Sequence, residues 1–372
     1  MKYYIIAGEA SGDLHGSYLI KAIKKEDPKA VFRAWGGDLM QAAGANLAMH
    51  YKSLAIMGFV DVIKNLPRIF KNISYCKSDI SGFKPDALIF IDFSGFNLRI
   101  APWAKAAGYT THYYIAPQLW ASRAKRVQKI KASVDHLYVT LPFEPAFYKK
   151  HHYKVNFVGH PLIDAMAAIE KPIKDWKNKQ GLEPEKPIIA LLPGSRKQEI
   201  KAILPVMAAL SHAQTEFQFV LGAAPGIDPD FYKEFIGKAP IVSLQNQTYA
   251  LLQHSTAALV TSGTATLETA LLGIPQLVCY KTQWLTYFIA KQIIKLPYIS
   301  LVNLILEKEA VPEFIQHNLK VGPLKTALNA IITGPKRAQQ LADMALLKTK
   351  LGAGGAASKA AMLIVKNSRN SM

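Results

Sequence analysis

Short apolar runs alternate along this chain with longer segments in which apolar and polar residues recur at helical spacing. This alternation predicts parallel α/β structure, because buried parallel strands are apolar on both faces and helices connect them. The first half predicts strands at Tyr3–Ala7, Ala87–Asp92, Thr110–Ile115, His136–Val139 and Val155–Val158, and helices at Leu14–Lys25, Leu98–Ala107 and Ala121–Ser133. The second half predicts strands at Ile188–Leu192, Gln218–Leu221, Ile241–Leu244, Ala257–Val260 and Gln276–Tyr280, and a helix that starts at Leu267–Leu272.

The length of 372 residues exceeds what one hydrophobic core usually organises, so two domains are expected. A polar run at Ile163–Asn178 separates the two alternations and is the predicted linker. We therefore expect domains at 1–165 and 166–345, followed by a terminal helix at 346–372 that crosses back to the first domain. The simplest architecture is two Rossmann-like parallel-sheet domains facing each other across a cleft.

The charge balance favours anionic partners. Forty-five basic and 26 acidic residues give a formal net charge of +19, which suits nucleic acid, an anionic membrane surface or phosphorylated substrates. The only cysteines, Cys76 and Cys279, lack metal-ligand spacing and predict neither a zinc site nor a disulfide framework. The short apolar start Met1–Gly8 is typical of a first strand, not a signal peptide, and no run approaches the ~20 apolar residues of a spanning helix.

Two glycine turns carry the strongest chemical signal. Leu191–Arg196 and Thr261–Glu268 each place a Gly/Ser/Thr turn after an apolar strand. Such turns offer backbone N–H groups to a phosphate, and Arg196 adds a cation that can bind two oxygens at once. Each turn alone is also compatible with a purely structural role. Together they predict a nucleotide site that lacks a Walker motif.

Polar residues also end strands in the first half. Gly8–Asp13 suits an acceptor or phosphate site, or an ordinary turn with Ser11 or Asp13 as helix cap. Asp92 ends a strongly apolar strand and is a candidate general base, or a helix cap together with Asn97. No second carboxylate is close in sequence, so activation of a hydroxyl by one base is expected in preference to a paired-carboxylate hydrolase.

Further candidates have weaker signals. Gln118 and Trp120 could contact a sugar, or could pack between strand and helix. His160 is expected to line the cleft or support the fold, and no metal site is predicted. The segment Met57–Ile73 is amphipathic and basic, and serves either as core or as a membrane-contacting surface. Its expected contact residues are Met57, Phe59, Val60, Ile63, Lys64, Arg68 and Phe70.

These motifs, in this order, make the whole chain resemble the lipid-A-disaccharide synthase family, inverting glycosyltransferases of the GT-B fold. The resemblance rests on Gly8–Asp13, Met57–Val62, Lys84–Asp86, Ile91–Asp92, Phe96–Asn97, Pro117, Trp120, Leu141–Glu144, Gly159–His160, Leu191–Arg196, Ser262–Glu268 and Ser300–Asn303. Two positions depart from it, because Gly95 stands where the family has a second aspartate and Ser122 where it has a tryptophan.

The resemblance implies transfer of 2,3-diacylglucosamine from its UDP derivative to 2,3-diacylglucosamine 1-phosphate, with a β-1,6 linkage and UDP as products. It implies an acceptor-binding, membrane-facing first domain and a donor-binding second domain, at the inner face of the inner membrane, with no cofactor or metal. A homodimer is compatible with it. The implied base is Asp92, and the implied donor residues are Arg196, Ser262, Gly263, Thr264, Glu268 and Asn303. The acceptor side would comprise Gly8, Glu9, Ser11, Gly12, Asp13, Asn97, Gln118 and Trp120.

Three alternatives remain at this point. Another UDP-sugar enzyme of the same fold, either a polyprenyl-lipid glycosyltransferase or a UDP-N-acetylglucosamine 2-epimerase, would use the same turns. A non-catalytic basic protein that binds nucleic acid or membrane is the third, but the spread of basic residues along the chain does not favour it.

Overall fold

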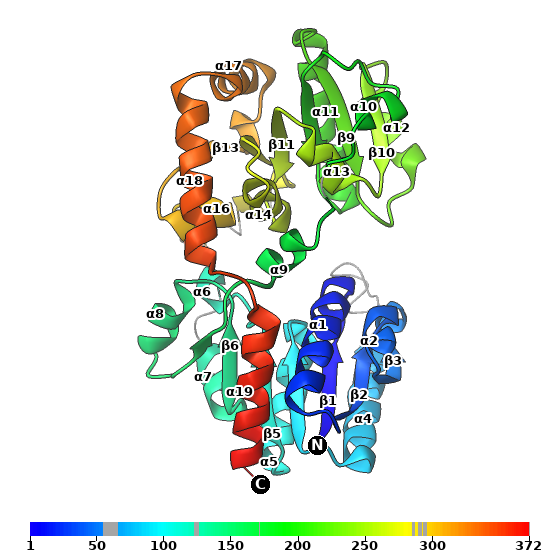
Figure 1. The fold of residues 1–372 in the computed structure, drawn as a ribbon, viewed down its shortest axis with the longest axis vertical. Helices are drawn as coiled ribbons and strands as arrows, with labels where there is room; N and C mark the ends of the chain where they lie inside the picture. The colour runs from blue at the N-terminus through cyan, green and yellow to red at the C-terminus, as the bar shows by residue number, and fades with distance from the viewer. Residues whose placement is uncertain are drawn as a thin grey trace. The chain divides into compact units, whose positions relative to one another are not determined.

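The computed structural model describes residues 1–54, 66–122, 126–170, 172–284, 287–288, 292 and 296–371 (Figure 1). Its contacts divide the chain into two compact units. The first comprises Met1–Pro161 together with Ala353–Met372, and the second comprises Leu162–Gly352.

The first unit is built on a seven-stranded sheet in which all neighbouring strands pair in parallel, in the order β3-β2-β1-β4-β5-β6-β7. All five strands expected from the first half are present, and β2 and β3 were not predicted. The strands are β1 (Lys2–Ala7), β2 (Val31–Gly36), β3 (Asn46–His50), β4 (Ala87–Ile91), β5 (Thr110–Tyr114), β6 (His136–Val139) and β7 (Asn156–Phe157).

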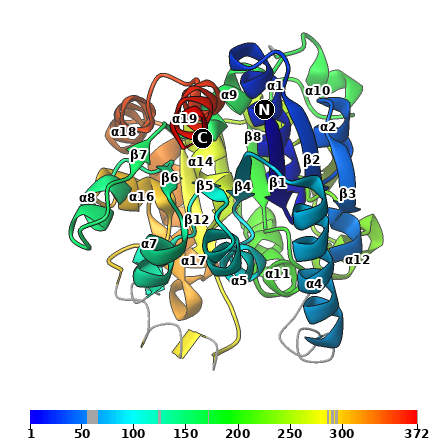
Figure 2. The same ribbon diagram turned by 90° about the horizontal axis from the view of Figure 1, so that it is seen from below.

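Helices cover both faces of this sheet because its strands are apolar on both. Tyr3 and Ile5 of β1 pack against α1 and α19, whereas Tyr4 and Ile6 pack on the side of α4, α5 and α7. Figure 2 shows α1 and α19 on one side of the sheet and α4, α5 and α7 on the other. The helices of this unit are α1 (Ala10–Glu26), α2 (Asp38–Ala42), η1 (Tyr51–Leu54), α4 (Leu66–Phe83), α5 (Ser94–Ala106), α6 (Leu119–Ser122), α7 (Val127–Ser133), α8 (Glu144–Lys149) and α19 (Ala356–Asn370). The expected helix Ala121–Ser133 overlaps α6 and α7, and its residues 123–125 lie outside the described residues.

The last helix belongs to the first unit. In Figure 1, α19 runs along α1, and its buried Ala360, Ile364 and Val365 join the same core cluster as β1. The preceding helix α18 (Pro335–Leu351) lies in the second unit, so the chain returns at Gly352–Gly355 and not at the expected residue 346. Three of these four residues are glycines with positive φ, a conformation that other residues rarely adopt.

The second unit contains a six-stranded parallel sheet in the order β10-β9-β8-β11-β12-β13. Its strands are β8 (Ile188–Leu192), β9 (Gln218–Ala223), β10 (Ile241–Gln245), β11 (Ala257–Thr261), β12 (Gln276–Tyr280) and β13 (Glu313–Ile315). The other helices are α9 (Pro161–Ala167), whose first residue still belongs to the first unit, α10 (Trp176–Lys179), α11 (Lys197–Ala213), α12 (Pro229–Ile236), α13 (Thr248–Gln253), α14 (Thr264–Leu271), α16 (Leu301–Leu306), η3 (Gln316–Asn318) and α17 (Val321–Ile332).

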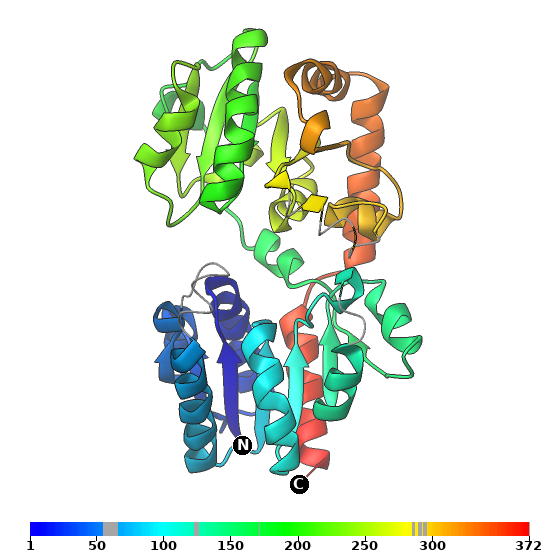
Figure 3. The ribbon, with the colours of Figure 1, turned by 180° about the vertical axis from the view of Figure 1, so that it is seen from behind.

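Here too the core has two layers. Ile189 and Leu191 of β8 pack on the side of α11 and α17, and Ile188 and Ala190 pack on the side of α10 and α13. Figure 3 shows α11 lying along one face of this sheet.

Each sheet has one point where the strand order reverses direction. In the first unit the chain builds outward from β1 to β3, and β4 then pairs with the opposite edge of β1. In the second unit β8 and β11 have the same relationship. Open α/β sheets bind ligands beside the carboxyl ends of the strands at such switch points. The fold therefore indicates one candidate ligand site in each unit.

A buried hydrogen-bond chain ties α19 to the sheet. Ser368 Oγ donates to the Ile364 carbonyl at 2.8 Å, so it accepts from Nε2–H of His112 at 3.0 Å. Nδ1 of His112 then accepts from the Tyr138 hydroxyl at 3.0 Å. Burial lowers the pKa of His112 to about 3, which keeps the imidazole neutral in this chain.

We predict that Ser368→Ala destabilises the protein by about 1–3 kcal/mol, because it leaves the Nε2–H donor of fully buried His112 without an acceptor. Urea unfolding measures the change. The matched control is Ser371→Ala, since Ser371 is exposed at the end of the same helix. Equal unfolding midpoints for the two variants would contradict the prediction.

Candidate active site

The switch point of the first unit brings two predicted motifs together. Ala7, the last residue of β1, pairs with Ile91 of β4, so the turn after each strand lies at the same edge. The Gly8–Asp13 turn follows β1, and Asp92 follows β4. A Cβ atom on Gly8 would lie 2.3 Å from the ring of Phe93, so the two turns pack too closely for any larger residue.

The backbone at Asp92 has an unusual conformation. Asp92 and Phe93 are consecutive non-glycine residues with φ of 43° and 45°. Such residues cost about 1–3 kcal/mol each and persist only where their surroundings hold them. Here Nδ2 of Asn97 donates to the Asp92 carbonyl at 2.8 Å, and the hydroxyl of Tyr113 donates to it at 2.5 Å. Asn97, expected to line the cleft or cap the helix, therefore supports the turn that presents Asp92.

The carboxyl group of Asp92 is suited to accept a proton. The residue is exposed, yet the protein atoms crowded around it partly desolvate its carboxylate and raise its pKa. The charge of Glu9 raises the pKa further. A higher pKa makes a carboxylate a better general base near neutral pH. Glu9 is distant from Asp92 in sequence, but pairing of β1 with β4 brings its carboxylate near Asp92.

Asp13 has a structural partner that the sequence did not reveal. Its buried carboxylate accepts from the backbone N–H groups of Gly37, Leu39 and Met40 at 2.7, 3.1 and 3.0 Å. These groups lie at the start of α2, so Asp13 caps that helix and not its own.

The other predicted acceptor residues occupy varied positions. Ser11 and Gln118 are exposed, and buried Gly12 packs against Ala7. Trp120 packs edge-on against Phe143, with 4.8 Å between ring centroids.

In the second unit the two glycine turns line one cavity of about 380 Å³, which we call the switch-point cavity. It lies where the carboxyl ends of β8, β9 and β11 meet, and its volume falls within the ~300–1,000 Å³ typical of small-molecule sites. Its lining residues are Leu192, Gly194, Ser195, Arg196, Glu199, Gly222, Ala224, Pro225, Thr248, Thr261, Ser262, Gly263, Thr264, Ala265 and Glu268.

The start of α14 gives this cavity the character of an anion site. The helix begins at Thr264, and Gly263 before it has no side chain to cap the first N–H groups. Those N–H groups and the helix dipole favour a phosphate at this end. One turn further, Oε1 of Glu268 accepts from the Tyr249 hydroxyl at 2.7 Å, and burial raises the pKa of Glu268.

Arg196 lies at the edge of the switch-point cavity. Its guanidinium side chain is 81% exposed and forms an ion pair with Glu199 at 2.9 Å. Exposed pairs of this kind are worth only about 0–1 kcal/mol, so an incoming phosphate can replace the carboxylate. The sequence did not point to Glu199 as the partner of Arg196, although a spacing of three residues at a helix start is the signal for it.

Asn303 supports the fold near this cavity and is absent from its described lining. Its buried amide donates to the Val311 carbonyl and to Glu313 Oε1, both at 2.8 Å, and accepts from Val311 N–H at 2.9 Å. Glu313 also accepts the N–H of Ile299 at 2.9 Å, and the Ile299 carbonyl accepts from Ser262 Oγ at 2.9 Å. Asn303 thus reaches the glycine turn through this chain of contacts.

Sequence reasoning missed the cavity wall supplied by β9 and α13, namely Gly222, Ala224, Pro225 and Thr248. No polar motif marks these residues. Their signal is topological, because β9 pairs with β8 and ends at the same edge.

Most of the predicted membrane-contact residues, from Met57 to Lys64, lie outside the described residues. Of the remainder, Phe70 on α4 is 63% exposed and Arg68 donates to the Ser53 carbonyl at 2.7 Å.

None of the helices in the described part of the chain is long and apolar enough to cross a membrane. Within those same residues, no group of three or more potential ligands is placed to hold a metal ion.

The two parallel α/β units, with a reversal of strand order in each sheet, have the GT-B fold. Solved structures with this fold include UDP-GlcNAc 2-epimerase from Neisseria meningitidis bound to UDP-GlcNAc, with a TM-score of 0.66, 13% identity and 99% coverage of both chains. The glycotransferase of kitacinnamycin has a TM-score of 0.65 at 12% identity, with 98% of each chain covered. At these identities the likeness shows the fold alone.

The particular family follows from sequence. The family model described as lipid-A-disaccharide synthetase matches residues 3–366. A lipid-A-disaccharide synthase of Syntrophus aciditrophicus is 39% identical, with 96% of each chain covered. Lipid-A-disaccharide synthase 1 of Legionella pneumophila is 35% identical, with 95% of this chain and 94% of the relative covered. The chain belongs to the lipid-A-disaccharide synthetase family and is a glycosyltransferase.

We predict that Glu9→Gln lowers the pKa of Asp92, because it removes a negative charge that opposes ionisation of the carboxyl group. Carbon NMR titration of labelled aspartates measures the shift, with Asp92→Asn to assign the signal. The control variant Glu9→Asp keeps the charge and is expected to leave the pKa close to its original value. An unchanged pKa in Glu9→Gln would refute the electrostatic coupling.

Proposed function

We propose that this glycosyltransferase transfers 2,3-diacylglucosamine from UDP-2,3-diacylglucosamine to the 6-hydroxyl of 2,3-diacylglucosamine 1-phosphate. The products are a β-1,6-linked disaccharide 1-phosphate and UDP. The observation that carries the proposal is the match to the lipid-A-disaccharide synthetase model over residues 3–366. The carboxylate at one switch point and the anion-binding helix start at the other support it.

In the proposed mechanism Asp92 is the general base. It removes the proton of the acceptor 6-hydroxyl while that oxygen attacks the anomeric carbon from the face opposite UDP, so the configuration inverts. The supports of the proposal are the exposed position of the carboxylate, its raised pKa and the two hydrogen bonds that fix its turn. With Gly95 in place of a second family aspartate, the base assignment rests on Asp92.

The second unit is proposed to bind the donor. Arg196 exchanges Glu199 for the diphosphate, and backbone N–H groups at Gly263 and Thr264 stabilise the charge that develops on departing UDP. Glu268 accepts a hydrogen bond from the ribose hydroxyls. Ser262 shapes the turn through its bond to Ile299. These cationic and dipolar groups supply the stabilisation without a metal or cofactor.

We also propose that the protein binds peripherally to the cytoplasmic face of an anionic membrane. Both substrates carry acyl chains, and the net charge of +19 attracts the chain to such a surface at about 1 kcal/mol per nearby basic residue. The segment Met57–Ile73, with exposed Phe70, is the proposed contact.

Incubation with both substrates tests the reaction, with UDP release and mass spectrometry of the disaccharide as readouts. Asp92→Asn is expected to lower kcat by about 10²- to 10⁴-fold, because the amide cannot accept the proton. The control is Asp230→Asn, which changes a carboxylate that is 78% exposed on α12. Near-normal turnover by a folded Asp92→Asn variant would disprove the assignment of Asp92 as the base. UDP release without disaccharide would disprove the proposed identity of the acceptor.

Sedimentation with anionic lipid vesicles tests the membrane proposal. Binding is expected to weaken as salt rises from about 50 to about 500 mM, because the Debye length shortens. Phe70→Ser is expected to reduce the vesicle binding that persists at high salt. Leu346→Ser, at a 45% exposed apolar residue of the second unit, is the control. Absence of vesicle binding at every salt concentration would rule out the proposal.

A further inference from the structure

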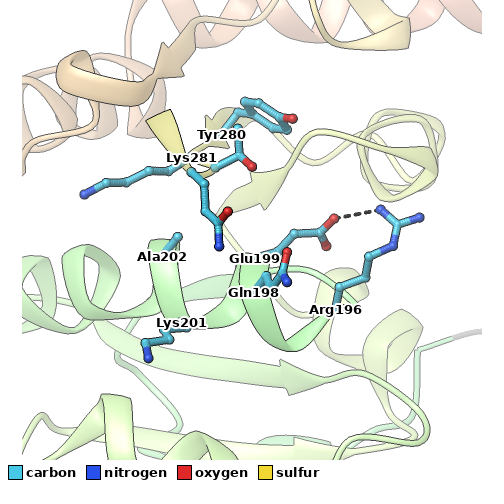
Figure 4. A pocket seen from close by; sticks show the side chains of 9 residues that line it. Arg196, Gln198, Glu199, Lys201, Ala202, Tyr280 and Lys281 are labelled. Atoms are coloured by element: carbon cyan, nitrogen blue, oxygen red, sulfur yellow. Dashed lines mark hydrogen bonds and ion pairs between the residues drawn. The ribbon is translucent and has the colours of Figure 1, made fainter. Parts of the chain in front are cut away.

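A second cavity lies beside the switch-point cavity, and no role has been assigned to it. It has a volume of about 540 Å³ and lies between the first turns of α11 and the residues that follow β12 (Figure 4). We call it the side cavity. Its lining residues from α11 include Glu199 and Ala202, and those from the end of β12 include Tyr280 and Thr282.

The two cavities share a wall. Arg196 and Glu199 line both, and Figure 4 shows their side chains turned toward each other in the ion pair. Because Arg196 is 81% exposed, the pair can open at little cost when a diphosphate takes the guanidinium. A ligand held by Arg196 in the switch-point cavity therefore extends naturally into the side cavity.

The order of the strands gives the direction of this extension. The switch-point cavity covers the ends of β9, β8 and β11, and β12 is the next strand of the sheet. The side cavity begins at the end of β12. A donor whose nucleoside lies near β9 and whose diphosphate lies at the start of α14 would have its sugar at β12.

The lining of the side cavity is polar, includes the charged groups of Lys201 and Lys281, and suits a sugar, and an apolar surface lies next to it. Tyr280, Thr282 and Gln283 offer hydroxyl and amide groups for a sugar, and Ala202 leaves space on α11. Gln283 directly precedes Trp284, which is 74% exposed and stacks on half-exposed Phe288 with 5.6 Å between ring centroids. An exposed aromatic pair beside Lys281 is typical of a surface that contacts lipid.

We propose that the side cavity receives the diacylated glucosamine of the donor, with its acyl chains leaving past Trp284 and Phe288. This inference rests on the proposed function, because it takes the donor to be UDP-2,3-diacylglucosamine. It assigns separate subsites to the two halves of the donor within one unit, the nucleotide in the switch-point cavity and the acylated sugar in the side cavity.

Ala202→Trp tests the assignment by filling the side cavity. We expect the dissociation constant for UDP to change by less than about twofold, and the KM for the acylated donor to rise by at least about tenfold, equivalent to ~1.4 kcal/mol. Ala209→Trp is the matched control, since Ala209 is exposed two helical turns further along α11. Thermal unfolding of both variants verifies that each is folded.

The outcomes separate this inference from the proposed function. Failure of the wild-type chain to form disaccharide would overturn the function itself. An active Ala202→Trp variant with an unchanged KM would overturn only the side-cavity assignment. If Ala202→Trp instead lost binding to phosphatidylglycerol vesicles while its donor KM stayed unchanged, the cavity would be a headgroup site and the proposal would be wrong. Should Ala202→Trp not fold, Ala202→Leu provides the same comparison with less added volume.

Discussion

Every strand pairing described in either sheet is parallel, and this one constraint decides where chemistry can occur. Parallel pairing places all carboxyl ends of a sheet at the same edge, so turns far apart in sequence become neighbours. It brings Glu9 near Asp92 across the β1–β4 pair, and Arg196 near Ser262 across the β8–β11 pair. The apolar strands must be covered on both faces, which leaves that edge as the place where polar groups can gather.

The side chains at these edges differ in burial and in hydrogen-bond partners. Asn97 and Tyr113 hold the carbonyl of Asp92, and Asp13 holds the start of α2. The Asp13 carboxylate and the Asn97 Nδ2 group are thus engaged with backbone groups of the fold. Asp92 and Arg196 are exposed and can exchange hydrogen-bond or ion-pair partners. This property suits the proposed proton transfer and diphosphate binding.

The fold class and the turns of the candidate site could be predicted from the sequence, because apolar strands and glycine turns have recognisable local patterns. It gave the second unit's two glycine turns, which the structure brings into one cavity. It could not distinguish Asp13 and Asn97 as supporting residues, because their partners are backbone groups of other segments. It missed the coupling of Glu9 to Asp92 and the wall from β9 for the same reason: both depend on which strands are neighbours.

The position of α19 has a consequence for synthesis of the chain. The second unit is formed by one continuous stretch, 162–352, whereas the face of the first sheet that α1 covers lacks its second long helix, α19, until residues 356–370 have been made. Domains fold as units as the ribosome releases them, in general the N-terminal one first. The first unit, by contrast, combines residues from before and after the second unit in the sequence, so it cannot be complete until the second unit has been made. A chain without α19 would leave the apolar surface that Ala360, Ile364 and Val365 cover exposed to water.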